Sequence, residues 1–200
     1  MSPRVLDVIQ RVCVYCASST KCDPIYRHAA TRLGQELARH EVVVVYGGGG
    51  VGLMGCLADG ALSVGGTVIG ILPNFMQELE WGHNGLTDLQ LVADMHTRKR
   101  LMIEGVDAVI ALPGGCGTLE ELFEAITWKR LGLYLNPIVL VNTQGFFDPC
   151  LELLERCVSE HFMDDRHRAM WTVVDEPEAV IAAIQQAPPW DSAAWKFAEV

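Results

Sequence analysis

The chain has 200 residues and a net charge of −10; half of its residues are hydrophobic and one fifth are charged. This composition is typical of a globular protein and excludes a disordered one. The acidic excess argues against a general nucleic-acid binder, which needs a basic face. Any phosphate ligand must therefore be attracted by local charge against the overall field of the protein.

The start of the sequence lacks a basic segment followed by an apolar run and a small-residue cleavage site. No apolar stretch approaches the ~18 to 20 residues that a membrane-spanning helix needs. We therefore expect a cytoplasmic protein with no membrane partner. The seven cysteines are an odd number in apolar surroundings, which favours reduced core thiols over a disulfide framework.

Short apolar runs rich in β-branched residues alternate with helical patterns along the chain. The predicted strands cover residues 12–16, 42–46, 67–72, 88–93, 107–112, 137–142 and 171–175. The predicted helices cover residues 24–40, 52–64, 95–105, 118–131, 148–161 and 176–186. This alternation predicts an α/β fold with a Rossmann-like, doubly wound parallel sheet.

We expect one nucleotide-binding domain over residues 1–187 and a C-terminal tail over residues 188–200. The tail carries two tryptophans, which either pack back onto the same chain or contact a partner subunit. Residues 74–87 form the longest irregular connection, and long loops in compact domains often line a site.

Cys13 and Cys16 form a C-x-x-C pair inside the first predicted strand. Positions three apart on a strand point to opposite faces of the sheet. Two core thiols are therefore favoured over a metal or redox site, because no second pair or histidine cluster follows at zinc spacing. We expect no metal site.

Two glycine-rich turns follow predicted strands, one over residues 46–55 and one over residues 113–118. Ligands of open α/β sheets bind beyond the carboxyl ends of the strands. Glycine lets a ligand approach the backbone closely, and the free N–H groups of the next helix bind phosphate. Either turn alone could be just a tight connection, but two in one sheet favour a shared phosphate site.

The first of these turns contains the G-x-G-x-x-G spacing at Gly50, Gly52 and Gly55. It follows the second predicted strand rather than the first, and no clear acidic partner follows, so dinucleotide binding is disfavoured. The chain also lacks the lysine of a Walker motif.

The segment MHTRKRLM places Met95, Arg98 and Met102 on one stripe of a helix. A buried guanidinium is costly unless an anion pairs with it. Arg98 therefore has two interpretations: an internal ion pair, with Glu121 as the candidate partner, or a cation that faces a ligand. Arg100 is expected to face solvent.

Residues 118–121 read TLEE, which fits a capping box with Thr118 as the N-cap and Glu121 at the third helical position. On this interpretation Glu121 only completes a helix; the alternative is a catalytic carboxylate. In both cases the helix N-terminus favours the charged form, so we expect Glu121 to be ionised at neutral pH.

Together, PGGCGTLEE (113–121), MHTRK (95–99) and GGGGVGLMG (47–55) resemble the "lonely guy" family, and the similarity extends over residues 12–165. Members of this family are Rossmann-like dimers. They hydrolyse the N-glycosidic bond of N6-modified adenosine 5′-monophosphates to a free base and ribose 5-phosphate. The resemblance therefore implies a nucleotide substrate, a homodimer and no cofactor.

The older family label, lysine decarboxylase, fits the sequence poorly. That reaction normally uses a pyridoxal phosphate Schiff base on a lysine. The four lysines are Lys21, Lys99, Lys129 and Lys196, and none lies in a recognisable cofactor pocket by sequence.

By resemblance, the catalytic residues are Arg98 and Glu121. The substrate contacts that it implies are Glu80, Lys99, Gly114, Gly115, Cys116, Gly117, Thr118, Leu119, Glu120 and Thr127, with Gly48 and Gly49 of the first glycine turn. Two positions depart from the family. Cys116 stands where an aromatic residue is common, and Ala17 stands where glycine is common and places a methyl group near the phosphate end.

An ionised Glu121 would stabilise the oxocarbenium-like sugar, hold the ribose hydroxyls or orient the attacking water. Arg98 would offset negative charge on the departing purine or on the phosphate, because a guanidinium is too weak an acid to donate a proton easily. Two alternatives share the fold: a molybdenum-cofactor carrier and a broader purine monophosphate nucleosidase. The presence of both residues in their motifs favours hydrolysis over carriage.

Overall fold

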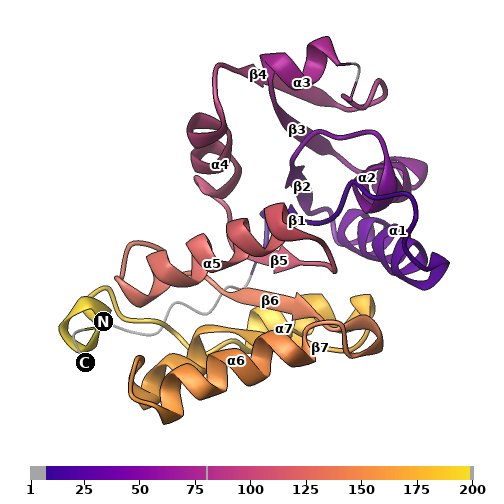
Figure 1. Cartoon of the computed structure of the whole chain (residues 1–200). Helices are drawn as coiled ribbons and strands as arrows, with labels where there is room; N and C mark the ends of the chain where they lie inside the picture. Colours follow the sequence, from indigo (N-terminus) through magenta and orange to yellow (C-terminus); the bar gives the residue numbers. More distant parts are fainter. Residues whose placement is uncertain (1–7, 80, 199–200) are drawn as a thin grey trace.

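The computed structural model describes residues 8–79 and 81–198. Over these residues seven parallel strands form one sheet in the order β4-β3-β2-β1-β5-β6-β7 (Figure 1). The strands are β1 (Arg11–Tyr15), β2 (Val43–Tyr46), β3 (Val68–Pro73), β4 (Asp88–Val92), β5 (Ala108–Ala111), β6 (Ile138–Val141) and β7 (Thr172–Val174). All of the predicted strands are present, so the parallel α/β fold is confirmed.

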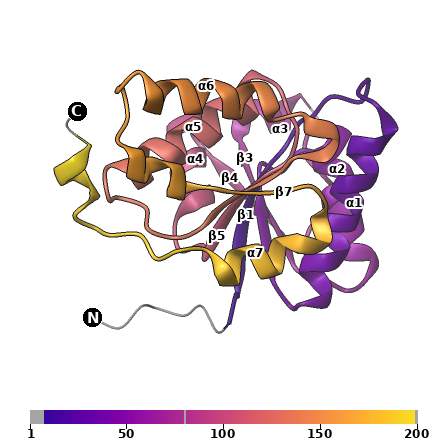
Figure 2. The same ribbon diagram turned by 90° about the horizontal axis from the view of Figure 1, so that it is seen from below.

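Helices cover both faces of the sheet, as Figures 1 and 2 show. They are α1 (Pro24–Arg39), α2 (Gly52–Ser63), α3 (Asn74–Glu78), α4 (Met95–Ile103), α5 (Cys116–Arg130), α6 (Asp148–Ser159) and α7 (Val180–Gln186). Helices α1, α2 and α7 pack on one face, and α4, α5 and α6 pack on the other. The sheet is therefore doubly wound.

Burial on both faces explains why the strands read as continuous apolar runs. In β1, Val12 and Val14 belong to the core under α1 and α2, whereas Cys13 and Tyr15 belong to the core under α4 and α5. Cys16 lies in the first of these cores. The prediction that Cys13 and Cys16 face opposite sides of the sheet is therefore confirmed, and all seven cysteines are free thiols.

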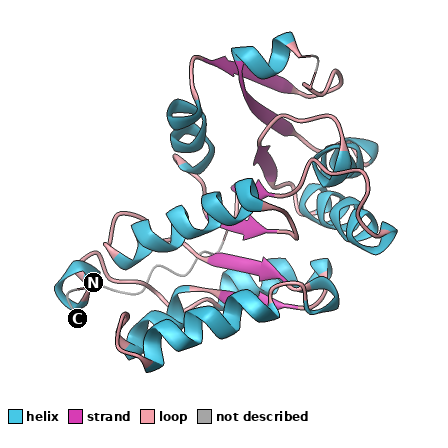
Figure 3. Ribbon diagram, viewed as in Figure 1, coloured by secondary structure: helices cyan, strands magenta, loops and turns pink. Residues whose placement is uncertain are grey.

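Several boundaries differ from the predicted ones. Helix α4 ends at Ile103, and Gly105, two residues further on, adopts a positive φ of 70° that terminates the helical path. The connection over residues 74–87 is not irregular throughout, because it begins with α3 (Figure 3) and Gly82 then forms a β-bridge with Gly49. A five-residue helix is too short to show a readable period.

The C-terminal tail packs back onto the chain through Trp190. The indole Nε1 of Trp190 donates a hydrogen bond to the carbonyl of Lys129 (2.6 Å), and its ring contacts those of His167 and Phe197. The second tail tryptophan, Trp195, stays exposed. Among residues 8–79 and 81–198, no helix combines the length and the hydrophobicity that crossing a bilayer requires.

Candidate active site

The sheet changes direction at its centre, between β1 and β5. The chain builds β1 to β4 outward, then returns through α4 to place β5 on the other side of β1. In such sheets the ligand crevice lies outside the carboxyl ends of the strands at this switch point. The segments that leave β1, β2 and β5 here are the loop over residues 16–19 and the two glycine turns.

A cavity of about 340 Å³ opens at this point. Its polar lining consists of residues after β1, one glycine of the first turn, one arginine of α4 and the start of α5: Ser18, Ser19, Gly47, Arg98, Gly115, Gly117, Thr118 and Glu121. An apolar wall, made of Met54, Met76, Trp81 and Met95, completes it. Residues of four helices, α2 to α5, therefore line one site together with the segments that follow β1, β2 and β5.

Arg98 and Glu121 form a buried ion pair inside this cavity. The Nη1 of Arg98 donates to the Oε1 of Glu121 at 2.9 Å, and the two residues are 5% and 6% exposed. The same guanidinium donates to the carbonyl of Ile71 (3.1 Å) and weakly to that of Gly47 (3.4 Å). The predicted internal ion pair is confirmed, and both side chains also border the open volume, so the pair can meet a ligand.

Local sequence explains how Arg98 reaches this position. Asp94 caps α4, because its Oδ1 accepts the backbone N–H of Thr97 at 2.8 Å. These hydrogen bonds hold the pKa of Asp94 below its usual value. Arg98 lies one turn further on, facing the sheet, whereas Arg100 is exposed and pairs with Glu104 (3.2 Å), as predicted.

Burial raises the pKa of Glu121 above its usual value of 4.5, and the charge of Arg98 opposes this shift. The helix N-terminus alone would lower this pKa, so burial acts in the opposite direction, and the ionisation of Glu121 at neutral pH stays a prediction. The folded protein binds this proton more tightly than the unfolded chain. Its contribution to the free energy of unfolding is therefore complete at low pH and is lost as pH rises through the folded pKa. A carboxyl of this kind in a cleft is typical of a catalytic group.

Helix α5 begins at Cys116 with Gly115 as its N-cap, and no side chain caps it. The predicted capping box is therefore wrong: Thr118 is the third residue of the helix, and Glu121 turns to Arg98 instead. The side chain of Thr118 lies over Gly114, where a Cβ atom would come within 2.1 Å of its Oγ1. The first backbone N–H groups of α5 have no partner inside the helix, so this end is suited to bind an anion.

The two glycine turns have different surroundings. In the first turn a Cβ on Gly52, whose φ is 64°, would lie 2.4 Å from the backbone of Ser18. At Gly50 it would lie 3.2 Å from the backbone of Gly82. In the second turn a Cβ on Gly115 or Gly117 would meet nothing within 4 Å. The space beside these last two glycines belongs to the cavity.

Not all of the candidate substrate contacts border the cavity within this chain. The ammonium group of Lys99 binds Glu120 and Glu124, and the hydroxyl of Thr127 donates to the carbonyl of Phe123 at 2.7 Å. Gly48, Gly49, Gly114, Cys116 and Leu119 belong to the two turns and the first turn of α5 but are not part of the lining. Glu80 lies outside the described residues. The roles of all these residues stay predictions.

Sequence reasoning missed the apolar wall. Met54, Met76 and Met95 carry no signal of this role, because the sequence alone does not distinguish an apolar residue that lines a pocket from one in the core. Trp81 had one usable signal, its position in the long connection after β3.

The lysines do not suit a pyridoxal phosphate site. None of the four, all within the described part of the chain, lines the cavity. Lys129 is buried, which lowers its pKa to about 8, but its Nζ donates to the carbonyl of Asn136 (2.7 Å). Lys99 is held by two carboxylates, and Lys21 and Lys196 are exposed. The described residues also include no group of three His, Cys, Asp or Glu placed to hold a metal ion.

Comparisons with solved structures support the fold. The molybdenum cofactor carrier protein from Chlamydomonas reinhardtii has a TM-score of 0.69 at 20% identity, over 90% of this chain and 98% of that one. The molybdenum cofactor binding protein from Rippkaea orientalis has a TM-score of 0.67 at 23% identity, over 90% and 97%. At such identities the likeness concerns the fold alone.

Sequence comparisons are more specific. The family model described as possible lysine decarboxylase matches residues 54–184. The cytokinin riboside 5′-monophosphate phosphoribohydrolase of Rhodococcoides fascians is 45% identical over 87% of this chain and 88% of its own length. A protein of the same name from Arabidopsis thaliana is 37% identical over 90% of this chain and 83% of its own length. The chain therefore belongs to the family described as possible lysine decarboxylases, the "lonely guy" family, whose curated members matched here are named as phosphoribohydrolases.

Proposed function

We propose that this chain hydrolyses the N-glycosidic bond of an N6-substituted adenosine 5′-monophosphate, releasing a cytokinin-type free base and ribose 5-phosphate. One observation carries the proposal: the buried Arg98–Glu121 pair borders the same cavity as the open start of α5. A carboxylate next to a helix N-terminus suits a substrate that carries a phosphate anion at one end and develops positive charge on its sugar. The relatives' names support the same reaction.

The 5′-phosphate would bind at the N-terminus of α5, where Gly115 and Gly117 leave room for its oxygens. This position brings the ribose toward Glu121, whose carboxylate stabilises the positive charge that builds on the sugar. Water adds to C1′ as the bond from C1′ to the purine nitrogen breaks. The guanidinium of Arg98 keeps Glu121 ionised and offsets negative charge on the departing base.

The decisive experiment compares the buried ion pair between α4 and α5 with an exposed ion pair elsewhere in the chain. Glu121→Gln and Arg98→Ala should each lower turnover by at least ~10²-fold, the usual scale for an electrostatic or acid–base group. Arg168→Ala and Glu155→Gln, which break an exposed pair (2.6 Å) outside the cavity lining, should leave turnover unchanged. The assay measures ribose 5-phosphate released from AMP and from isopentenyladenosine monophosphate. Near-normal turnover by a folded Glu121→Gln or Arg98→Ala variant would refute the assignment.

The same assay separates the two alternatives. A broader purine nucleosidase would cleave AMP and the isopentenyl nucleotide equally well. A molybdenum-cofactor carrier would release ribose 5-phosphate from neither and would bind the pterin cofactor tightly. The likeness to carrier proteins extends only to the fold, so it does not support carriage here.

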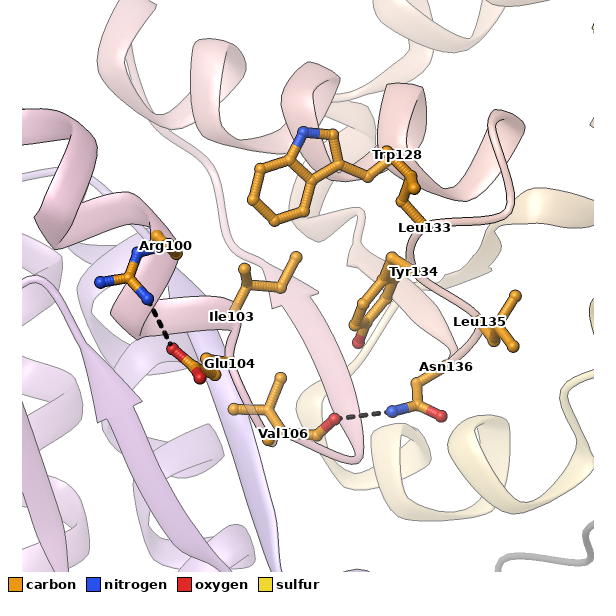
Figure 4. A pocket seen from close by; sticks show the side chains of 10 residues that line it. Arg100, Ile103, Glu104, Val106, Trp128, Leu133, Tyr134, Leu135 and Asn136 are labelled. Carbon is orange, nitrogen blue, oxygen red and sulfur yellow. Dashed lines mark hydrogen bonds and ion pairs between the residues drawn. The ribbon is translucent and has the colours of Figure 1, made fainter. Parts of the chain in front are cut away.

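We also propose that the chain acts as a homodimer in the cytoplasm. Seven free thiols support a reducing compartment. A groove of about 430 Å³ lies between the end of α4 and the last turn of α5 with the segment that follows it. Ile103, Trp128 and Leu133 line this groove with apolar side chains (Figure 4). Leu133 is 71% exposed. If this groove is the dimer contact, Leu133→Glu should give monomers in analytical ultracentrifugation, whereas Leu153→Glu, at the 55% exposed Leu153 of α6, should not.

A further inference from the structure

Trp81 stands out among the cavity residues because it is a large aromatic side chain held at the opening of a polar site. It is 53% exposed, yet it borders the cavity together with Met54, Met76 and Met95. An indole that is half exposed to water lacks part of the favourable free energy that burial in the core would give it. An exposed aromatic beside a cleft is a common feature of ligand recognition.

The backbone of Trp81 is fixed on both sides. Its N–H donates to the carbonyl of Met76 (3.2 Å), and its carbonyl accepts the N–H of Gly50 (2.9 Å). The next residue, Gly82, forms the β-bridge with Gly49. The backbone of Trp81 is thus hydrogen-bonded to the first glycine turn. The same turn contains the Gly47 carbonyl that contacts Arg98.

A second anchor follows two residues later. The N–H of His83 donates to the carbonyl of Gly48 (2.9 Å), and its Nδ1 accepts the N–H of Gly85 (3.0 Å). The Nδ1 is therefore unprotonated in this bond, so the Nε2 donates to the Oδ1 of Asp59 on α2 (3.0 Å). These contacts tie the segment around Trp81 to both the turn and α2. The backbone that carries the indole is consequently anchored to the first glycine turn and to α2.

The proposed substrate has a polar part and an apolar part, and the cavity has a polar side and an apolar side that match them. The phosphate and ribose need N–H groups, a carboxylate and a cation, all of which lie on the side of α5 and Arg98. The remaining part of the substrate is a flat, weakly polar purine, and the apolar wall supplies the large apolar side chains of the lining. Stacking on an aromatic ring suits any base, because every base has a π-face. Thioethers beside it adapt their shape to an apolar substituent.

We propose that Trp81 is a base-binding residue that stacks on the purine leaving group. This inference rests on the proposed hydrolysis and extends it by assigning the base-binding side of the site. It separates the two ends of the nucleotide: Trp81 contributes to binding of the base and contributes nothing to binding of ribose 5-phosphate.

The test compares Trp81→Ala, Trp81→Phe and Trp195→Ala. Trp195 is 56% exposed and lies in the tail, so it is a matched control for the loss of an exposed indole. Trp81→Ala should lower kcat/KM for both AMP and isopentenyladenosine monophosphate roughly ten-fold to a hundred-fold, mainly through KM. Trp81→Phe should restore most of this loss, and Trp195→Ala should behave as the wild type.

Product inhibition supplies the second readout. The inhibition constant of ribose 5-phosphate should be unchanged in Trp81→Ala, whereas that of free adenine should rise by a similar factor to KM. Equal weakening of both products would show a general structural role and overturn the proposal. An unchanged KM in Trp81→Ala would overturn it while leaving the hydrolase assignment intact.

If the wild type releases no ribose 5-phosphate, the hydrolase assignment fails, and equilibrium binding decides the role of Trp81 independently. Titration with AMP should quench the fluorescence of the wild type and not that of Trp81→Ala. Equal quenching in the two proteins would refute stacking.

Discussion

The two glycine turns look alike in the sequence but have opposite surroundings in the structure. The first, after β2, is filled at two of its glycines: a Cβ on Gly52 would meet the backbone of the loop after β1, and a Cβ on Gly50 would meet the backbone of Gly82 and His83. The second, after β5, is empty on one side, because nothing lies within 4 Å of a Cβ built on Gly115 or Gly117.

This difference shows that glycine serves two purposes at one sheet edge. In the first turn it lets three segments of the protein approach one another, which is a matter of folding. In the second turn it keeps a volume free beside the unpaired N–H groups of α5, which is a matter of binding. Substitution by alanine should therefore lower stability in one turn and substrate affinity in the other.

The largest expected effect is on stability, from Gly52→Ala. The new methyl group would lie 2.4 Å from the backbone of Ser18, and the φ of 64° strains any L side chain. We expect the free energy of unfolding, measured with urea, to fall by about 3 kcal/mol or more. Gly65→Ala is the matched control, since its φ is 80° but its Cβ would meet nothing within 4 Å.

Gly65→Ala should therefore lose only about 1–2 kcal/mol, the cost of the strained backbone. If the two variants lose the same free energy, close packing is not what requires glycine in the first turn, and the contrast between the turns is refuted.

The next effect is on binding, from Gly117→Ala. Alanine is a better helix former than glycine, so the free energy of unfolding should rise by up to about 1 kcal/mol. The methyl group would occupy space beside the phosphate-binding N–H groups, so KM for AMP should rise at least about ten-fold. Steady-state kinetics and urea denaturation of the same preparation measure both quantities. A variant with lower stability and unchanged KM would reverse the roles of the two turns.

The smallest effect comes from Gly47→Ala, which tests the one glycine of the first turn that lines the cavity. Its Cβ would lie 2.0 Å from the Nη2 of Arg98, the mobile end of a long side chain. Arg98 should shift away from Glu121, and the pKa of Glu121 should then rise further, because the charge of Arg98 lowers it.

In the proposed mechanism hydrolysis requires ionised Glu121, so kcat/KM falls as pH decreases through this pKa. The acid limb of the pH profile should therefore move to higher pH in Gly47→Ala, with a loss of a few-fold at neutral pH. An acid limb that stays in place would show that Arg98 does not set the ionisation of Glu121.

The sequence predicted the sheet well because its strands are buried on both faces. Runs such as residues 42–46 are apolar throughout and rich in valine, which favours a strand buried on both faces over a buried helix segment. It also predicted that Arg98 faces inward, since Met95 and Met102 mark the buried stripe. It could not choose a partner for Glu121. The capping box is a local pattern within four residues, whereas the actual partner is 23 residues away and depends on how α4 crosses the sheet.

The apolar wall was beyond sequence reasoning for a related reason. Trp81 reaches the cavity only because Gly49 and Gly82 bridge, and that contact joins segments from two different strand connections. Helix periodicity carries no information about such a contact. The resemblance to a family named the catalytic pair, but it assigned no residue to the base.

Every lining residue of the cavity falls between Cys16 and Glu121, and none comes from β6, β7 or the helices that follow. A truncated chain ending after α5 would hold the whole cavity lining and still lack the partner of β5. All four residues of β5 are apolar and buried, and on the β6 side they would present an unpaired edge. Such an edge recruits other chains, so the fragment would aggregate rather than catalyse. The last third of the chain thus keeps the protein soluble by covering the edge of β5, and a minimal enzyme should retain it.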